Sequence, residues 1–194
     1  MEADATAIAT IYAPIVERTP ISFETTPPSV EELRRRIRET VPELPWLVCE
    51  QDGNVVGYAY ASPYSGRAAY RWTVTVSVYV DSQWRRRGIA RGLYTSLVAL
   101  LRLQGFYTAI AVIALPNEPS VSFHESLGFE RAGIYRRIGY KEGAWRDVGH
   151  WQLELQPAGN RRSPPEPPAS LDELQGSDRF DEALATGTMS ITPP

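Results

Sequence analysis

The sequence predicts an α+β fold in which helices flank a twisted, mostly antiparallel sheet. The clearest evidence is the segment 73–80, where Thr, Ser and Tyr alternate with valine at the period of two that characterises a strand. Helical patterns stand before and directly after this strand, and the complete order is helix, helix, three strands, helix, strand, helix and two strands. This order, without an internal repeat, indicates one sheet covered by helices.

Two helices are expected at the start of the chain. The first has a possible N-cap at Asp4, and its apolar residues recur at helical spacing: Ile8, Ile11, Tyr12 and Ile15. The second follows Ser29, which forms a capping-box pair with Glu32. Because Leu33 and Ile37 share one face of this helix, the arginines at 34, 35, 36 and 38 are expected mostly on the solvated side.

Strands are expected over residues 46–50 and 54–61, and the turn Asp52-Gly53 between them predicts an antiparallel hairpin. Residues 107–115 are nearly all apolar, as in a strand covered on both faces, and residues 135–140 and 148–155 form the last two predicted strands. The single cysteine, Cys49, falls in the first strand and is expected to be a buried small hydrophobe.

Two more helices lie between the later strands. The longer one carries an apolar stripe and is expected to end at Gly105; the stripe consists of Ile89, Leu93, Leu97 and Leu101. The shorter one covers residues 120–127 and is stopped by Gly128.

The composition changes after residue 155. Prolines at 157, 164, 165, 167 and 168 precede a polar stretch with few large apolar residues. We therefore expect one domain over residues 1–156 and a mostly disordered tail over residues 157–194, in which Leu171 and Leu174 could nucleate a short helix.

Composition also excludes several classes of partner. The net charge of -3 and the pI of about 5.5 provide no positive field for nucleic acid or an anionic membrane. No apolar run approaches the roughly 20 residues that cross a bilayer, so a cytoplasmic protein is expected. No cluster of His, Cys and acidic residues has metal-ligand spacing, and His150, beside Trp151 in a late strand, is expected to be structural.

The strongest local signal is the run Arg85-Arg86-Arg87-Gly88-Ile89-Ala90 between a strand and a helix. Free backbone N–H groups at a helix start form an anion site, and Gly88 and Ala90 leave room for a diphosphate to approach the backbone. The glycine spacing matches neither a Walker loop nor a Rossmann fingerprint. A solvated basic helix start is the alternative interpretation.

The pattern Arg85-x-x-Gly88-x-Ala90 after a valine-rich strand resembles the signature (Gln/Arg)-x-x-Gly-x-(Gly/Ala) of the GNAT N-acetyltransferases. The resemblance extends over residues 2–156. The segments YRWTV at 70–74, AVIALPN at 111–117 and GYK at 139–141 resemble the phosphinothricin N-acetyltransferase branch in particular. The resemblance implies the GNAT fold, acetyl-CoA as co-substrate, a small amino-acid-like amine as acceptor, and a homodimer.

The resemblance assigns the cofactor site by position. It implies that backbone groups of Val78, Tyr79 and Val80 meet the pantetheine arm and that Asn117 hydrogen-bonds the cofactor near its thiol end. The pyrophosphate would lie on the segment formed by Arg86, Arg87, Gly88, Ile89, Ala90 and Arg91.

The resemblance also indicates the residues of catalysis. Transfer is expected to be direct, so the amine needs a base and the leaving thiolate needs an acid. His124 stands where this branch has a histidine and many other members have a tyrosine acid, so it is a candidate thiolate acid or proton relay. Thr75 stands where the branch has its presumed base, a glutamate, and a hydroxyl cannot replace a carboxylate in that role.

The departure at Thr75 leaves several outcomes open. Proton removal could use a water chain through Thr75 and Ser77, or a base supplied by Glu24 or His124. A changed substrate or weak activity would also follow, since a general base typically contributes 10²- to 10⁴-fold to the rate.

The acceptor is expected beside the loop 64–71, where Arg67 or Arg71 could hold a carboxylate. The complete set of candidate acceptor-binding residues is Phe23, Ser65, Gly66, Arg67, Arg71, Thr75, Val76 and Ser77. Relatives usually have a strand before the first helix, so either the true start of the chain lies upstream or the sheet lacks an edge strand here.

Three other functions compete with this hypothesis. A peptide or protein N-terminal acetyltransferase would have the same cofactor half. An acyl-CoA-binding protein with weakened catalysis would explain Thr75. An α+β interaction domain whose tail recruits partners would need no cofactor.

Overall fold

The computed structural model describes residues 2–157 and 165–191. Its centre is a six-stranded sheet in the order β1-β2-β3-β4-β6-β5. The strands are β1 (Trp46–Gln51), β2 (Asn54–Pro63), β3 (Thr73–Val80), β4 (Thr108–Leu115), β5 (Glu130–Lys141) and β6 (Ala144–Glu154). β3 and β4 run parallel, whereas the other neighbouring pairs of this sheet are antiparallel. The predicted α+β class is confirmed.

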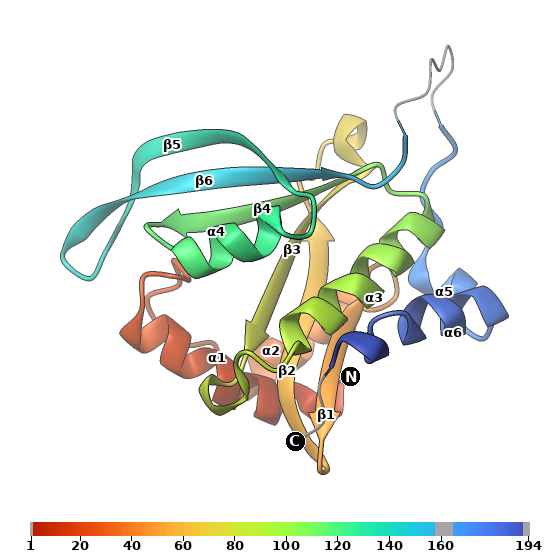
Figure 1. The fold of residues 1–194 in the computed structure, drawn as a ribbon, viewed down its shortest axis with the longest axis horizontal. Helices are drawn as coiled ribbons and strands as arrows, with labels where there is room; N and C mark the ends of the chain where they lie inside the picture. The colour runs from red at the N-terminus through yellow and green to blue at the C-terminus, as the bar shows by residue number, and fades with distance from the viewer. Residues whose placement is uncertain (1, 158–164, 192–194) are drawn as a thin grey trace.

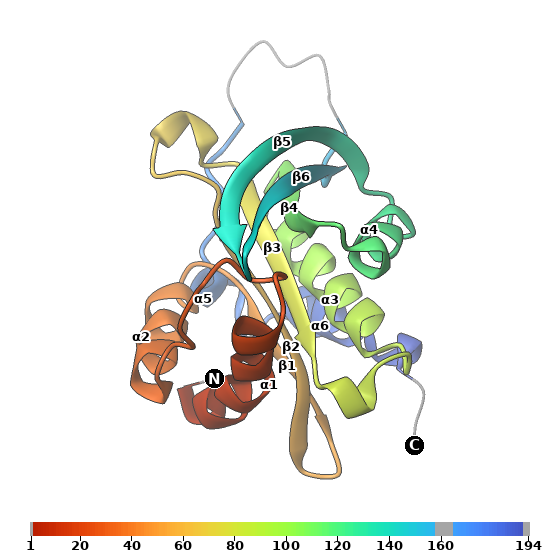
Figure 2. The same ribbon diagram turned by 90° about the vertical axis from the view of Figure 1, so that its left-hand side faces the viewer.

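Helices cover both faces of the sheet, as Figure 2 shows, and two separate apolar cores result. On one face, α1 (Ala5–Arg18) and α2 (Val30–Thr40) enclose Ile8, Ile37 and Tyr58. On the other face, α3 (Ile89–Gln104) and α4 (Glu118–Glu125) pack over a core that includes Leu97 and Trp151. None of the described helices combines the length and apolar character needed to cross a bilayer.

Local sequence signals account for most element ends. The Ser29 hydroxyl accepts a hydrogen bond from the Glu32 amide at 3.1 Å and caps α2. The Glu32 carboxylate of the predicted capping-box pair instead accepts from Arg35 and Arg36. Asp52 and Gly53 both have positive φ, as the predicted hairpin turn requires, and Gly105 ends α3 in the left-handed conformation. Asp4 precedes α1, but its side chain does not cap the helix.

The last hairpin is longer than predicted. β5 and β6 are joined by the two-residue turn Glu142-Gly143, in which both residues have positive φ. β5 begins five residues before the predicted strand 135–140. The sequence does not predict this earlier start, because the side chains of β5 are exposed almost throughout and so do not alternate between apolar and polar. The expectation that β4 is covered on both faces also fails at Val112, which is 49% exposed. Cys49 is buried, as expected.

The expected disorder of the tail is wrong for residues 165–191. This segment forms α5 (Leu171–Leu174), α6 (Asp178–Ala185) and the 3-10 turn η4 (Thr188–Ser190), and it lies along α3 (Figure 1). The proposed nucleus is present, because Leu171 is buried in α5. Hydrogen bonds to the backbone of the segment hold it in place, and composition does not reveal them. The Ser96 hydroxyl donates to the Leu184 carbonyl, and the Gln104 side-chain amide donates to the Ala169 carbonyl. Residues 158–164 and 192–194 of the predicted tail lie outside the described residues.

Candidate functional site

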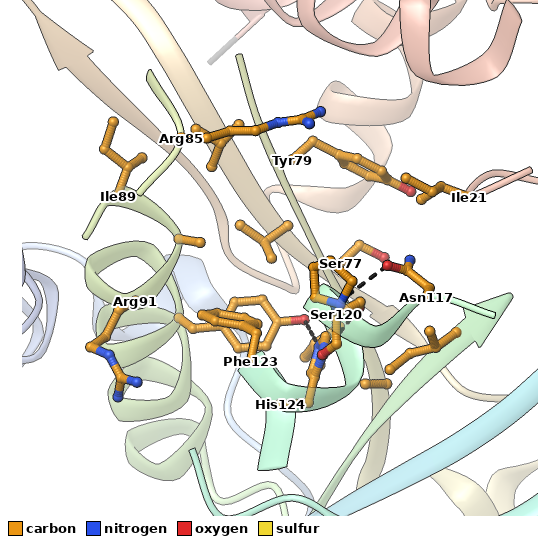
Figure 3. A pocket seen from close by; sticks show the side chains of 18 of the residues that line it. Ile21, Ser77, Tyr79, Arg85, Ile89, Arg91, Asn117, Ser120, Phe123 and His124 are labelled. Carbon is orange, nitrogen blue, oxygen red and sulfur yellow. Dashed lines mark hydrogen bonds between the residues drawn. The ribbon is translucent and has the colours of Figure 1, made fainter. Parts of the chain in front are cut away.

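A cavity opens where two parallel strands separate. β3 and β4 pair from Thr73↔Thr108 to Val76↔Ala111, and beyond this point β3 stays paired with β2 while β4 stays paired with β6. The resulting cavity has a volume of about 570 Å³ and is lined by both strands and by residues of α1, α3 and α4 (Figure 3). Val78, Tyr79 and Val80 all line it, and in this stretch the edge of β3 that faces β4 carries no strand partner within the sheet.

The turn before α3 forms one end of the cavity. Arg86 and Gly88 both have left-handed φ, 63° and 77°, and this alternation turns successive backbone N–H groups to one side. Gly88 is the N-cap of α3 and offers no side-chain cap to the N–H groups of the first helical turn. These N–H groups and the positive end of the helix dipole favour an anion.

The arginines of this turn are not equivalent. Arg85 and Arg86 line the cavity, and Figure 3 shows Arg85 on the same side as Tyr79. The Arg87 guanidinium instead stacks on the Trp84 ring at 4.6 Å from its centroid, and Arg87 does not line the cavity. Arg91 lines the cavity, but its guanidinium donates to the Ser126 hydroxyl at 2.8 Å.

His124 occupies the wall formed by α3 and α4 and is 5% exposed. Its Nδ1 lies 2.7 Å from the Ser120 carbonyl oxygen, and its Nε2 lies 3.0 Å from the Tyr94 hydroxyl. Because a carbonyl only accepts, Nδ1 carries a proton, and in the neutral imidazole Nε2 then accepts from Tyr94. Burial lowers the pKa of His124, so the neutral form predominates at neutral pH.

Tyr94 completes this pair and was missed by the sequence analysis. Burial raises its pKa far above the ordinary value for tyrosine, so it retains its proton. It is one of the buried residues of α3 next to the predicted apolar stripe, where an aromatic residue indicates only core packing. The spacing of residues in the sequence carries no signal for its contact with α4.

Asn117 lies at the start of α4 and lines the cavity (Figure 3). Its side-chain oxygen accepts from the Ser120 amide at 3.3 Å and so caps the helix. This bond uses the oxygen, and the NH₂ group remains a donor that a ligand can use.

The comparisons with known proteins identify the family. The model of the acetyltransferase (GNAT) domain matches residues 1–150, about three quarters of the chain. The chain belongs to the GNAT acetyltransferase family. The family and the enzyme class expected from the sequence are therefore confirmed.

Relatives of this GNAT chain include two kinds of amino-acid acetyltransferase. A phosphinothricin N-acetyltransferase of Streptomyces viridochromogenes is 42% identical over 154 residues, which are 79% of this chain and 84% of the relative. An L-methionine sulfoximine/L-methionine sulfone acetyltransferase of Pseudomonas aeruginosa is 32% identical, over 80% of this chain and 91% of the relative. A phosphinothricin acetyltransferase of Sinorhizobium meliloti, solved with acetyl-CoA, superposes with a TM-score of 0.81 at 35% identity, over 87% of this chain and 91% of that one.

Some of the candidate acceptor residues of this GNAT chain line the cavity and others do not. Thr75 does not line the cavity, and its hydroxyl lies 2.7 Å from that of Ser62. Val76 and Ser77 do line the cavity. The other candidate acceptor residues lie outside it: Phe23, Ser65, Gly66, Arg67 and Arg71.

The loop candidates are held in local contacts. Arg71 donates to the Ala68 carbonyl and lies over the Trp72 ring, and Ser65 accepts from the Arg67 amide. Phe23 packs directly on the backbone of Gly139 in β5. Their roles in acceptor binding stay predictions.

The candidate base Glu24 is also held by other side chains. Its carboxylate pairs with the Arg36 guanidinium at 2.8 Å and accepts from the Tyr12 hydroxyl at 3.1 Å. No carboxylate is present among the described residues that line the cavity. Within the described part of the chain, no group of three or more His, Cys, Asp or Glu could hold a metal ion.

Proposed function

We propose that this GNAT enzyme transfers the acetyl group of acetyl-CoA to the amino group of a small amino-acid-like acceptor of the phosphinothricin or methionine sulfoximine type. The observation that carries the proposal is the cavity between β3 and β4, which ends on the uncapped turn at Gly88. The activities of the two relatives supply the acceptor class. Acetyl-CoA is an intracellular metabolite, so the cytoplasm is the proposed location.

The described residues fit this cofactor. Backbone N–H groups around Gly88, together with Arg85 and Arg86, would hold the diphosphate. The open edge of β3 at Val78–Val80 would bond the pantetheine amides as an added strand does. The NH₂ group of Asn117 would donate near the thiol end.

The pair Tyr94 and His124 would then carry one proton through the reaction. When the amine attacks the thioester carbonyl, the new C–N bond leaves an excess proton on nitrogen. This proton passes to the Tyr94 oxygen while the Tyr94 proton moves to Nε2 of neutral His124. As the C–S bond breaks, the same path runs in reverse and returns the proton to the departing thiolate.

Only one observation, the threonine at position 75 in place of the expected glutamate, favours a second function. An acyl-CoA-binding protein with weakened catalysis would keep the cavity and the turn but would lack an efficient base. A peptide acceptor is less favoured, because the relatives named above act on free amino-acid analogues.

We also propose that two copies of the chain pair through β5. This strand is an edge of the sheet, and large apolar side chains stand exposed on its hairpin with β6: Tyr135, Ile138, Tyr140 and Trp145. An exposed apolar edge strand of this length is a ready interface. Sedimentation of the full chain tests the pairing.

The test of the proposed function is the release of free CoA thiol. The full chain is mixed with acetyl-CoA and with L-phosphinothricin or L-methionine sulfoximine, and the expected result is thiol release that depends on the acceptor. Binding of acetyl-CoA without transfer to either acceptor or to other free amino acids would favour the acyl-CoA-binding protein.

A further inference from the structure

The proposed reaction requires the removal of two protons from nitrogen. A free amino acid carries an ammonium group near neutral pH, and an ammonium cannot attack the thioester. The pair Tyr94 and His124 returns the second proton to sulfur, so it is not available for the first. A separate base must therefore take the ammonium proton, and no carboxylate among the described lining residues can do this.

Strand register places the second histidine of the chain on the acceptor face. Paired residues of neighbouring strands point to the same face, and residues two apart on one strand do so as well. Thr75 pairs with Ile110, and Val112 pairs with His150. Thr75, Val112 and His150 therefore share the face of the sheet that α1 covers, on which family resemblance predicts the missing glutamate.

His150 does not line the cavity itself, but its cross-strand neighbour Val112 does. Val112 lines the cavity, is 49% exposed and lies directly opposite His150 in the register. Side chains in such cross-strand pairs have Cβ atoms about 4.5–5.5 Å apart. Ser77, two residues beyond Thr75 on β3, also lines the cavity on this face.

The imidazole of His150 is not committed to a hydrogen bond. Its Nδ1 is buried and has no hydrogen-bond partner among the described residues. Its ring contacts Tyr135 edge to face at 5.1 Å between centroids. His124, in contrast, has both ring nitrogens engaged. A buried polar atom without a partner is unusual and calls for an explanation, and a proton acceptor held ready for a ligand is one.

The surroundings of His150 favour its neutral form. The residues nearest to His150 on its face carry no formal charge at neutral pH: Val112, Gly133, Tyr135, Val148 and Gln152. The charged residues of this face lie farther along the strands: Glu130 opposite Gln152, and Arg146 and Glu154 on β6. Desolvation accordingly lowers the pKa of His150. A neutral imidazole has the lone pair that a base needs.

We propose that His150 is the general base for the ammonium group of the acceptor, in place of the carboxylate that Thr75 cannot provide. This proposal rests on the proposed function. The ammonium N–H bond breaks and its proton goes to His150, which leaves a neutral amine to form the C–N bond. His150 then releases that proton to solvent, and the second proton reaches sulfur through Tyr94 and His124.

The test compares His150→Phe with the parent, because phenylalanine keeps a ring against Tyr135 but cannot accept a proton. With L-methionine sulfoximine as acceptor, kcat/KM at pH 7 should fall about 10²-fold, within the usual range for a general base. The Kd for acetyl-CoA should stay within twofold. Melting temperature serves as the check of folding, and His150→Gln repeats the test if the phenylalanine variant does not fold.

Two further measurements separate a base from a structural residue. Added imidazole should restore at least a tenth of the parental rate to His150→Ala. In the Thr75→Glu background, which supplies a carboxylate, His150→Phe should lower kcat/KM less than threefold. The proposal is overturned if His150→Phe transfers acetyl at the parental rate. It is also overturned if His150→Phe lowers kcat/KM equally in the parental and Thr75→Glu backgrounds and imidazole does not restore activity to His150→Ala. A parent chain without any transfer activity would instead refute the proposed function.

Discussion

At the scale of single residues, the proton path depends on the pair formed by Tyr94 and His124. We predict that Tyr94→Phe lowers kcat about 10²-fold, because the phenolic oxygen that links the acceptor nitrogen to His124 is removed. The Kd for acetyl-CoA should not change, since the turn at Gly88 is untouched. Steady-state kinetics and calorimetry measure the two quantities.

The matched control is Tyr58→Phe. Tyr58 is another buried tyrosine, but it belongs to the core beneath α1 and α2 rather than to the cavity. This variant should retain the parental kcat. A parental kcat for Tyr94→Phe would contradict the relay.

Some of these residues can be predicted from the sequence and others cannot. Gly88 follows from a local motif, whereas the family resemblance assigns Asn117 and His124, and the structure places all three around one cavity. Tyr94 and Val112 carry no local signal, because their positions at the cavity result from the packing of α3 on α4 and from the separation of β3 and β4. His150 was interpreted as structural because a histidine beside a tryptophan in a strand gives no indication of the face to which it points.

At the scale of elements, the carboxy-terminal segment is a packed part of the fold. The Ser96 hydroxyl donates to the Leu184 carbonyl at 2.6 Å and accepts from the Gly187 amide at 3.1 Å. Gly187 lies so close to Gly92 of α3 that a side chain at position 187 would collide with the helix backbone. Close approach of two backbones of this kind requires glycine.

We predict that Gly187→Val lowers the free energy of unfolding by about 1–3 kcal/mol, the usual cost of forcing extra atoms into a packed interface. Urea unfolding measures the change. Met189→Ala is the control, because Met189 in the same segment is 94% exposed and its truncation should cost less than about 0.5 kcal/mol. Equal stability of the two variants would show that the segment is not docked on α3.

The segment illustrates why composition alone was misleading. Its prolines and its few large apolar residues are typical of a disordered tail. Its order instead depends on backbone hydrogen bonds to Ser96 and Gln104 and on glycine contacts, none of which leaves a pattern of hydrophobicity.

At the scale of the whole molecule, the α+β class and nearly every element followed from periodicity and turn residues. The order of strands in the sheet did not, because β4 enters between β3 and the last hairpin through contacts distant in sequence. This strand order creates the cavity on which the proposed function depends. It makes β3 and β4 parallel neighbours that part after Val76, and so opens the cavity beside the turn at Gly88.

The claim that a diphosphate lies on this turn can be tested without any mutation. Calorimetry would compare acetyl-CoA with S-acetylpantetheine, which keeps the thioester arm but lacks the diphosphate, and with acetyl-dephospho-CoA, which keeps the diphosphate. We predict that acetyl-CoA and acetyl-dephospho-CoA bind within tenfold of each other, whereas S-acetylpantetheine binds at least 100-fold more weakly, about 2.7 kcal/mol. Equal affinity for acetyl-CoA and S-acetylpantetheine would contradict the account.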